Sequence, residues 1–296
     1  MSNVYLHSKD NIKSIVSKYI LALIPLIIYG FYKNGIKLYI NGLVTIRGLF
    51  KPLVFDFLGL FVGLLVNIIY NKIKNIKSDI FANFYPLYGL LIVSVVSINT
   101  NIYLLGMVIF IILLASKFIS KFNFNIPALG ATVVILLTDV INWFTYSNMY
   151  ERSNVLTLDI IDYLIGRGTG GVNTTFILFL LFSLFILCRE KTYKKEIALY
   201  TTVTYSLCIF IYLFIHNDIP LFSSYLFSNG ILFSFIFIAP ETISSSYSFK
   251  GKLIYGIFVG VLTFIIYLRY PVGAVFIAIL LISFFNKLID KVCEKS

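Results

Sequence analysis

Charged side chains are scarce in this chain. Asp, Glu, Lys and Arg make up 12% of its 296 residues, about half the share found in an ordinary soluble domain. Hydrophobic residues make up 59%, and the mean hydropathy is +0.93. A water-soluble fold of this length has too small an interior to hide so much apolar surface. The composition therefore excludes a soluble protein and predicts an integral membrane protein.

Side chains that bind metals or form disulfides are also few. Cys188, Cys208 and Cys293 are far apart, and their spacing matches neither a zinc site nor a disulfide framework. His7 and His216 are isolated, which argues against a histidine-ligated haem. The sequence therefore predicts no metal site.

The chain contains ten apolar runs that are long enough to cross, or nearly cross, a bilayer. Several are shorter than the ~20 residues of a straight transmembrane helix. Those that open at Pro86, Pro127 and Pro271 predict broken or re-entrant helices. The ten runs are residues 18–32, 53–70, 86–98, 102–116, 127–141, 174–188, 197–215, 225–239, 253–268 and 272–285.

Basic side chains are distributed unevenly between the connections. If the N-terminus is cytoplasmic, 17 of the 24 Lys and Arg residues lie in cytoplasmic loops, as the positive-inside rule requires. Topology thus explains the net charge of +11 better than nucleic-acid binding does. The pattern predicts ten spans in the cell membrane, with both termini in the cytoplasm.

Ten spans divide into two halves of five, and an odd number of spans per half inverts the second half. The fifth span opens with Phe124-Asn-Ile-Pro-Ala128 and the tenth with Tyr270-Pro-Val-Gly-Ala274. Paired interruptions of this kind are typical of inverted-repeat membrane proteins with a central site. We therefore expect one all-α membrane domain, residues 1–296, of about ten helices, some of them broken. Its two inverted five-helix repeats would be residues 1–145 and 146–296.

A glycine-rich loop, residues 166–175, precedes the sixth span. Backbone N–H groups in such a loop, together with a helix N-terminus, are suited to binding a phosphate such as that of a flavin. The alternative is a flexible helix entry that Asn173 or Thr174 caps. The candidate cofactor-binding residues are Arg167, Gly168, Thr169, Gly170, Gly171, Asn173 and Thr174.

Three carboxylates lie in or beside the apolar spans, where an ionisable residue indicates function. Glu241 precedes a run of hydroxyl side chains. This group is suited to binding a cation in passage or to hydrogen bonding with the edge of an isoalloxazine ring, or alternatively to forming a turn and a helix cap. Asp56 and Asp139 lie near span ends and belong either to an ion pathway or to the solvated headgroup layer. The predicted pathway residues are Asp56, Asp139, Glu241, Ser244 and Ser245.

Three stretches resemble one family, the membrane-embedded B subunit of Na⁺-pumping NADH:quinone oxidoreductase and the D subunit of the Rnf complex. Phe124-Asn-Ile-Pro-Ala128 is similar to the family's Phe-Asn-Pro-Ala motif, with one residue inserted. Residues 164–175 occupy the place of its glycine-rich segment. The third stretch resembles its C-terminal signature through Ala239-Pro-Glu241, Lys250-Gly251, Tyr255-Gly256, Tyr270-Pro-Val-Gly273 and Leu288-Ile-Asp290.

The resemblance implies ten helices in two inverted halves, like those of urea transporters. It also implies electron transfer through flavins, coupled to Na⁺ or H⁺ movement. The protein would then be a non-autonomous subunit of a redox-driven translocase, and its partners would be other membrane and flavin-carrying subunits. Family members usually attach flavin mononucleotide to a threonine in Ser-Gly-Ala-Thr. This chain lacks that tetrapeptide, and the nearest candidate is Thr157, in Ser153-Asn-Val-Leu-Thr157. The expected cofactor is flavin mononucleotide, covalent or bound, or riboflavin.

The missing tetrapeptide leaves two other hypotheses open. One is a transporter or channel on the same fold, for a small polar solute or a flavin. The other is a purely structural membrane anchor, which would leave the glycine-rich loop and Glu241 without a role. The C-terminal signature favours the electron-transfer protein.

Overall fold

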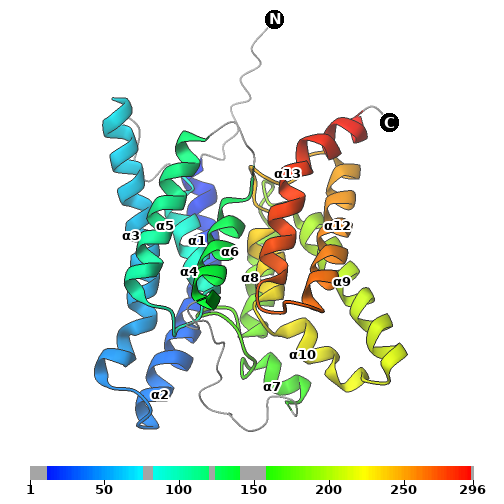
Figure 1. The fold of residues 1–296 in the computed structure, drawn as a ribbon, viewed down its shortest axis with the longest axis horizontal. Coiled ribbons are helices and arrows are strands. Elements are labelled where there is room, and N and C mark those ends of the chain that lie inside the picture. Colours follow the sequence, from blue (N-terminus) through cyan, green and yellow to red (C-terminus); the bar gives the residue numbers. More distant parts are fainter. Residues whose placement is uncertain (1–11, 76–82, 120–123, 141–157, 295–296) are drawn as a thin grey trace, which may run out of the picture.

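The computed structural model describes residues 12–75, 83–119, 124–140 and 158–294. All regular elements in these ranges are helices (Figure 1). The first half contains α1 (Ile12–Phe31), the π-helix η1 (Tyr32–Ile36), α2 (Lys37–Ile40), α3 (Ile46–Lys74), α4 (Tyr85–Val95), α5 (Ile102–Phe118) and α6 (Ile126–Val140). The second half contains α7 (Ile160–Leu164), α8 (Ile177–Cys188), α9 (Lys195–His216), the 3₁₀ helix η3 (Ile219–Leu221), α10 (Phe222–Phe227), α11 (Ile231–Phe233), the π-helix η4 (Ser234–Ile238), α12 (Phe249–Tyr267) and α13 (Ala274–Glu294).

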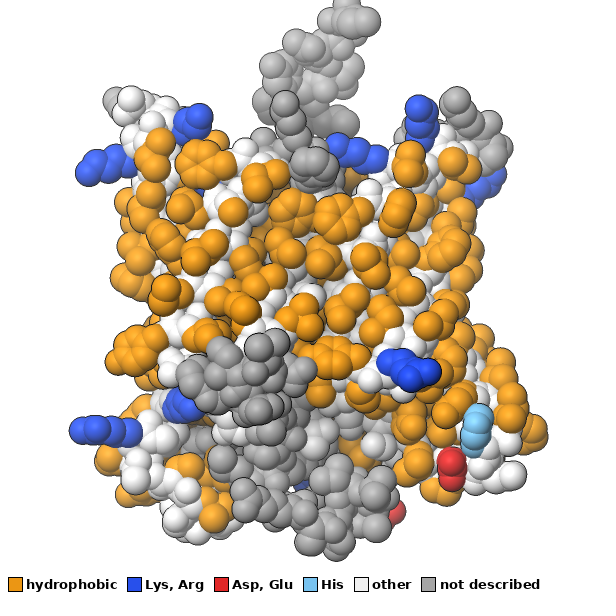
Figure 2. Space-filling view, in the orientation of Figure 1, with side chains coloured by type: hydrophobic (Ala, Val, Ile, Leu, Met, Phe, Trp, Pro, Cys, Tyr) orange, Lys and Arg blue, Asp and Glu red, His pale blue; other side chains and the backbone are white. Residues whose placement is uncertain are grey.

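The helices have the length and composition of a multi-pass membrane protein. Four are long and apolar enough to span a bilayer: Ile12–Ile40, Ile46–Lys74, Lys195–His216 and Phe249–Tyr267. The pair Ile219–Phe227 and Ile231–Phe237 is bent by 48° and has the length and composition of a broken span or a re-entrant loop. Helices α4, α5, α6 and α8 are shorter and apolar. Apolar side chains cover the middle of the visible face in Figure 2, and most of the Lys and Arg side chains lie toward its two ends. The predicted all-α membrane fold is confirmed.

The sharpest break in a span comes from an Asn-Gly pair rather than from proline. Asn229 and Gly230 have φ angles of 57° and 70°, a left-handed conformation that these two residue types adopt most readily. This turn separates α10 from α11. Pro86 and Pro127 instead lie in the first turns of α4 and α6, where the missing N–H removes no helical hydrogen bond. These two prolines therefore begin helices and do not bend them.

The order of packing is the one that two inverted halves would produce. Ile12 at the start of α1 and the last turn of α13 lie at the same end of the molecule (Figure 1). In the first half α3 packs on α5, and in the second half α9 packs on α12. The first and last helices of each half pack on their counterparts, α1 on α8 and α6 on α13. The assignment of two repeats, residues 1–145 and 146–296, remains a prediction that this packing supports.

Helices α3 and α4 approach each other at glycines. A Cβ atom on Gly89 of α4 would lie 2.1 Å from the carbonyl oxygen of Gly59 on α3. A Cβ atom on Gly63, one turn further along α3, would lie 2.4 Å from the carbonyl oxygen of Tyr85. Small residues at such crossings let membrane helices come into backbone contact. This contact holds α4 in the centre of the protein, where residues 86–95 are all buried.

We expect Gly89→Val to destabilise the protein, because the added side chain overlaps the backbone of α3. Overpacking of this kind costs about 1–3 kcal/mol or more, which a thermal unfolding measurement in detergent resolves. Gly106→Ala on α5 is the matched control, since its Cβ would lie 3.4 Å from the nearest side-chain atom, Leu58 Cδ1. Equal unfolding temperatures for the two variants would contradict the close packing of α3 and α4.

Candidate functional site: two buried polar clusters on α4

The first polar cluster joins α3, the end of α4 and the glycine-rich loop. Asp56 lies about 15 Å along α3 from its first residue, at 1.5 Å per residue, and is 5% exposed. The Asn173 side-chain amide donates to Asp56 Oδ1 at 2.7 Å and to Ser94 Oγ at 3.2 Å. Beyond α4 the loop pairs with the extended chain, since Val172 N donates to Val96 O at 3.0 Å. Asp56 is therefore buried among protein groups and is not solvated, and its place in an ion pathway stays a prediction.

Two oxygen atoms of this cluster have no hydrogen-bond partner among the described residues. Asp56 Oδ2 and Asn173 Oδ1 are both inaccessible and unpaired. An unsatisfied buried acceptor costs about 1–3 kcal/mol, and more when it is charged. Carboxylate and amide oxygens are the ligands that hard cations prefer, and a proton on Asp56 would also remove the charge. The chemistry of the cluster therefore suits a proton or a small hard cation.

The π-helix η1 supplies two further partners of the loop. Lys33 Nζ donates to Gly168 O at 2.7 Å, and the Asn34 side-chain amide donates to Val172 O at 2.9 Å. Lys33 is 8% exposed. Neither residue was predicted from the sequence, because their only signal was a Lys-Asn-Gly triplet at the end of the first apolar run. These contacts fix the loop against the first helix.

The glycines of the loop serve close packing. A Cβ atom on Gly171 would lie 2.5 Å from the backbone carbon of Val95. The space beside Gly170 and Gly171 has a volume of about 10 Å³, close to the minimum for one water molecule, and does not fit a flavin. Arg167 is exposed and forms an ion pair with Asp162 at 2.7 Å. No mechanistic step through a flavin follows from this geometry, and flavin contacts of Arg167, Gly168, Thr169, Gly170, Gly171, Asn173 and Thr174 remain a prediction.

The helix after the loop begins later than the capping alternative requires. The residue before α8 is Phe176, which has no side-chain capping bond. The alternative in which Asn173 or Thr174 caps this helix is therefore wrong, and Asn173 bonds to Asp56 instead. Thr157 lies outside the described residues. Asp139 lies in α6, but its side chain also falls outside the described part of the chain.

The second polar cluster surrounds Glu241, in the turn that follows η4. This carboxylate is 5% exposed. Its Oε1 accepts hydrogen bonds from the Tyr88 hydroxyl on α4 and, at 3.2 Å, from Ile243 N. Its Oε2 accepts from Ser244 N at 2.8 Å and from the Ser244 hydroxyl. Four donors thus satisfy both carboxylate oxygens of Glu241 inside the protein.

Asn125 connects this cluster to two more helices. Its side-chain amide donates to Ile238 O at 2.8 Å and to Ser244 Oγ at 3.1 Å. Its backbone N–H donates to Ser283 Oγ on α13 at 3.1 Å. Asn125 is the asparagine of the Phe124-Asn-Ile-Pro-Ala128 motif, which carried the family resemblance but was not predicted as part of the site. The motif therefore joins the start of α6 to the end of η4.

Lys194 provides the positive charge nearest to the serine-rich turn. It lies in the connection between α8 and α9 and is 5% exposed. Its Nζ donates to Thr242 O at 3.0 Å, Ser245 O at 2.7 Å and Ser245 Oγ at 2.9 Å. Burial lowers the pKa of Lys194 to about 8, against the opposing fields of Glu241 and Asp290. The lysine is therefore still mainly charged at pH 7 and balances the Glu241 carboxylate.

The serine-rich turn also attaches to the last helix. The Ser246 hydroxyl donates to Asp290 Oδ1 on α13, and Tyr247 N donates to the same oxygen at 3.3 Å. Ser248 is the actual N-cap of α12, and its hydroxyl accepts from Gly251 N at 3.0 Å. The turn and helix cap predicted for this segment are present, whereas cation binding by its hydroxyl groups stays a prediction. Ser248 forms the helix cap, while Ser244 and Ser245 form a buried polar network with Glu241.

Helix α4 connects the two clusters. Tyr88 bonds to Glu241, and Ser94 accepts a hydrogen bond from Asn173, the partner of Asp56. Six residues of helix separate Tyr88 from Ser94, a rise of about 9 Å. Two carboxylates far apart in the sequence thus lie close to a single, fully buried helix.

Comparison with known proteins identifies the family. The whole chain, residues 1–296, matches the NQR2, RnfD, RnfE family. The chain belongs to this family. A stretch of 132 residues is 35% identical to the D subunit of the ion-translocating oxidoreductase complex of Mannheimia succiniciproducens. That stretch covers 43% of this chain and 35% of the relative, so the match spans about a third of the curated relative's length. The family that the sequence motifs resemble is therefore confirmed, and this protein is a member of the NQR2, RnfD, RnfE family.

Proposed function

We propose that this protein is a membrane component of an ion-translocating oxidoreductase complex of the Rnf and Nqr type. Its partners are the other membrane and flavin-carrying subunits of that complex. Family membership, the relative from Mannheimia succiniciproducens and the multi-pass helical fold support this assignment. The strongest structural support for this proposal is the pair of buried carboxylate clusters that α4 connects.

In the proposed route the ion passes between these clusters. We assign the end of the molecule at which α1 begins and α13 ends to the cytoplasm, because basic residues are most numerous in the connections there. Glu241 then forms the cytoplasmic cluster and Asp56 the outer one. Tyr88 and Asn173 orient the two carboxylates, and the unpaired oxygens of Asp56 and Asn173 receive the ion. The fully buried faces of α4 exclude water between the clusters.

Flavin mononucleotide is the cofactor that the family resemblance implies, and it supplies electron transfer when bound. The space beside the described loop does not fit it, so the proposed attachment residue remains Thr157. The mass of the intact protein, expressed together with its partner subunits, tests this proposal. An increment equal to flavin mononucleotide less one water molecule supports attachment, and the bare chain mass contradicts it.

A deletion and complementation experiment tests the proposed function. Membrane vesicles that lack this protein are expected to lose ion uptake driven by electron transfer, and expression of the chain is expected to restore it. The transporter alternative predicts something different. Under that alternative the purified protein alone would move a polar solute into proteoliposomes, and vesicles without it would keep their redox-driven ion uptake.

A further inference from the structure

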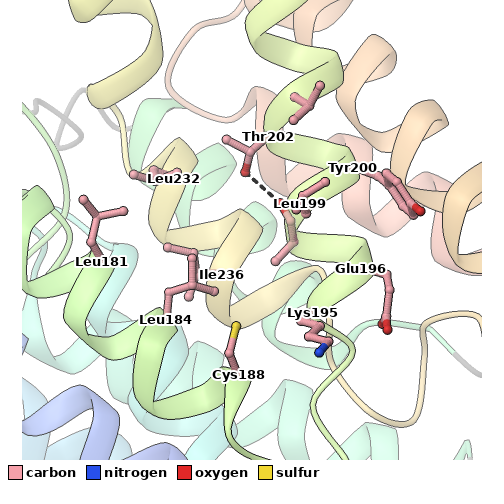
Figure 3. A pocket seen from close by; sticks show the side chains of 12 residues that line it. Leu181, Leu184, Cys188, Lys195, Glu196, Leu199, Tyr200, Thr202, Leu232 and Ile236 are labelled. Atoms are coloured by element: carbon pink, nitrogen blue, oxygen red, sulfur yellow. Dashed lines mark hydrogen bonds between the residues drawn. The ribbon is translucent and has the colours of Figure 1, made fainter.

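An apolar groove lies between α8 and α9, away from both polar clusters (Figure 3). Leu184 and Cys188 of α8 line one wall, Leu199 and Thr202 of α9 line the other, and Ile236 of η4 lies at its floor. The groove exists because its walls pack on different neighbours, α8 on α1 and α9 on α12. Its volume is about 410 Å³.

One end of the groove is cationic. Lys195, the first residue of α9, lines this end beside Cys188, while Leu181 and Leu232 line the groove further along (Figure 3). The Lys195 ammonium is exposed and forms no hydrogen bond or ion pair with the described residues. The neighbouring Glu196 is already paired with Lys252 at 3.2 Å. Glu196 lines the same end of the groove, but its single carboxylate faces both Lys252 and Lys195, which leaves a net positive charge there.

The groove runs along α8. Its wall from Leu181 to Cys188 is two turns long. A single hydrocarbon chain is narrow enough to lie along the groove. Apolar walls and one cationic end match a lipid with a negative headgroup.

We propose that this groove binds one acyl chain of an anionic phospholipid, with the headgroup phosphate at Lys195. The chain lies along Leu184 and Leu199 and covers Ile236, the floor of the groove. The phosphate takes the place of the carboxylate partner that Lys195 lacks. The bound lipid fills the gap between α8 and α9 beside the bent span and supports η4, which leads into the Glu241 turn.

Native mass spectrometry of the purified protein tests this site. We expect phosphatidylglycerol to bind about five-fold more tightly than phosphatidylcholine with the same chains. Both headgroups contain a phosphate, but the choline cation offsets that charge in phosphatidylcholine, and one lysine near a net anionic headgroup contributes a factor of this size. Lys195→Gln removes that preference, whereas Lys191→Gln, a nearby exposed lysine outside the groove, keeps it. Leu199→Trp fills the groove and weakens the binding of both lipids.

Leu207→Trp is the matched control for the groove itself. Leu207 lies two turns further along α9, is 56% exposed compared with 58% for Leu199, and does not line the groove. Equal binding of the two lipids by the unaltered protein would overturn the headgroup assignment. Lipid binding that survives Leu199→Trp would overturn the groove. Cross-linking of Leu199→Cys to a partner protein in the assembled complex would show that a protein occupies it instead.

Discussion

Glu241→Ala is expected to destabilise the protein more than any other single carboxylate substitution described here. The change removes the acceptor of four hydrogen bonds, from Tyr88, Ile243 and both donors of Ser244. It also leaves the buried ammonium of Lys194 without its nearest negative charge. Breaking a buried charged network by removing one partner costs about 3–5 kcal/mol. Thermal unfolding in detergent and the yield of folded protein measure this loss.

Two further variants separate the causes of that loss. Glu241→Gln keeps the shape and one oxygen acceptor, so we expect it to lose less stability than Glu241→Ala. Glu196→Ala removes a carboxylate that is 26% exposed and paired with Lys252, where exposed ion pairs contribute about 0–1 kcal/mol. If Glu241→Ala unfolded at the same temperature as Glu196→Ala, the buried network around Glu241 would not stabilise the fold.

Asp56→Asn is expected to stop ion movement and to leave the fold intact. Asparagine has nearly the same shape, and its side-chain oxygen can still accept the hydrogen bond from Asn173. The substitution removes a buried negative charge whose second oxygen is unpaired, so the unfolding temperature should stay the same or rise. It also removes the group that would bind a proton or cation. Ion flux driven by electron transfer should therefore fall close to background.

A substitution nearby provides the control for Asp56. Ser94→Ala removes one acceptor of Asn173 but keeps the bond between Asn173 and Asp56. We expect this variant to retain most of the ion flux. If Ser94→Ala and Asp56→Asn lost flux equally, packing around Asn173, and not the Asp56 carboxylate, would explain the defect.

The sequence predicts the helical membrane fold well, because local patterns determine it. The apolar runs correspond to the observed helices, and the motifs from Ala239 to Asp290 identify the family. The Asn-Gly break at residues 229–230 was also readable as a turn signal, although the predicted breaks lay at prolines. Local patterns therefore indicate which segments span, and less reliably where a span bends.

The polar clusters could be predicted only in part, because distant segments build them. Asp56 and Glu241 were found as carboxylates in apolar surroundings. Glu241 accepts from Tyr88, 153 residues away in the chain, and Asp56 accepts from Asn173, 117 residues away. No local pattern connects these pairs. The glycine-rich loop shows a second limit. The absence of a Cβ atom suits both phosphate binding and close packing, and only the structure shows that Gly171 packs against Val95.

The number of ions moved per electron transferred tests the central claim most directly. Proteoliposomes that contain the complete complex, with either the unaltered protein or Asp56→Asn, would be supplied with electron donor while electron transfer and ion uptake are recorded together. We predict coupled uptake with the unaltered protein and a ratio near zero with Asp56→Asn, at equal amounts of assembled complex. An unchanged ratio in the Asp56→Asn complex would contradict an ion route through the clusters on α4.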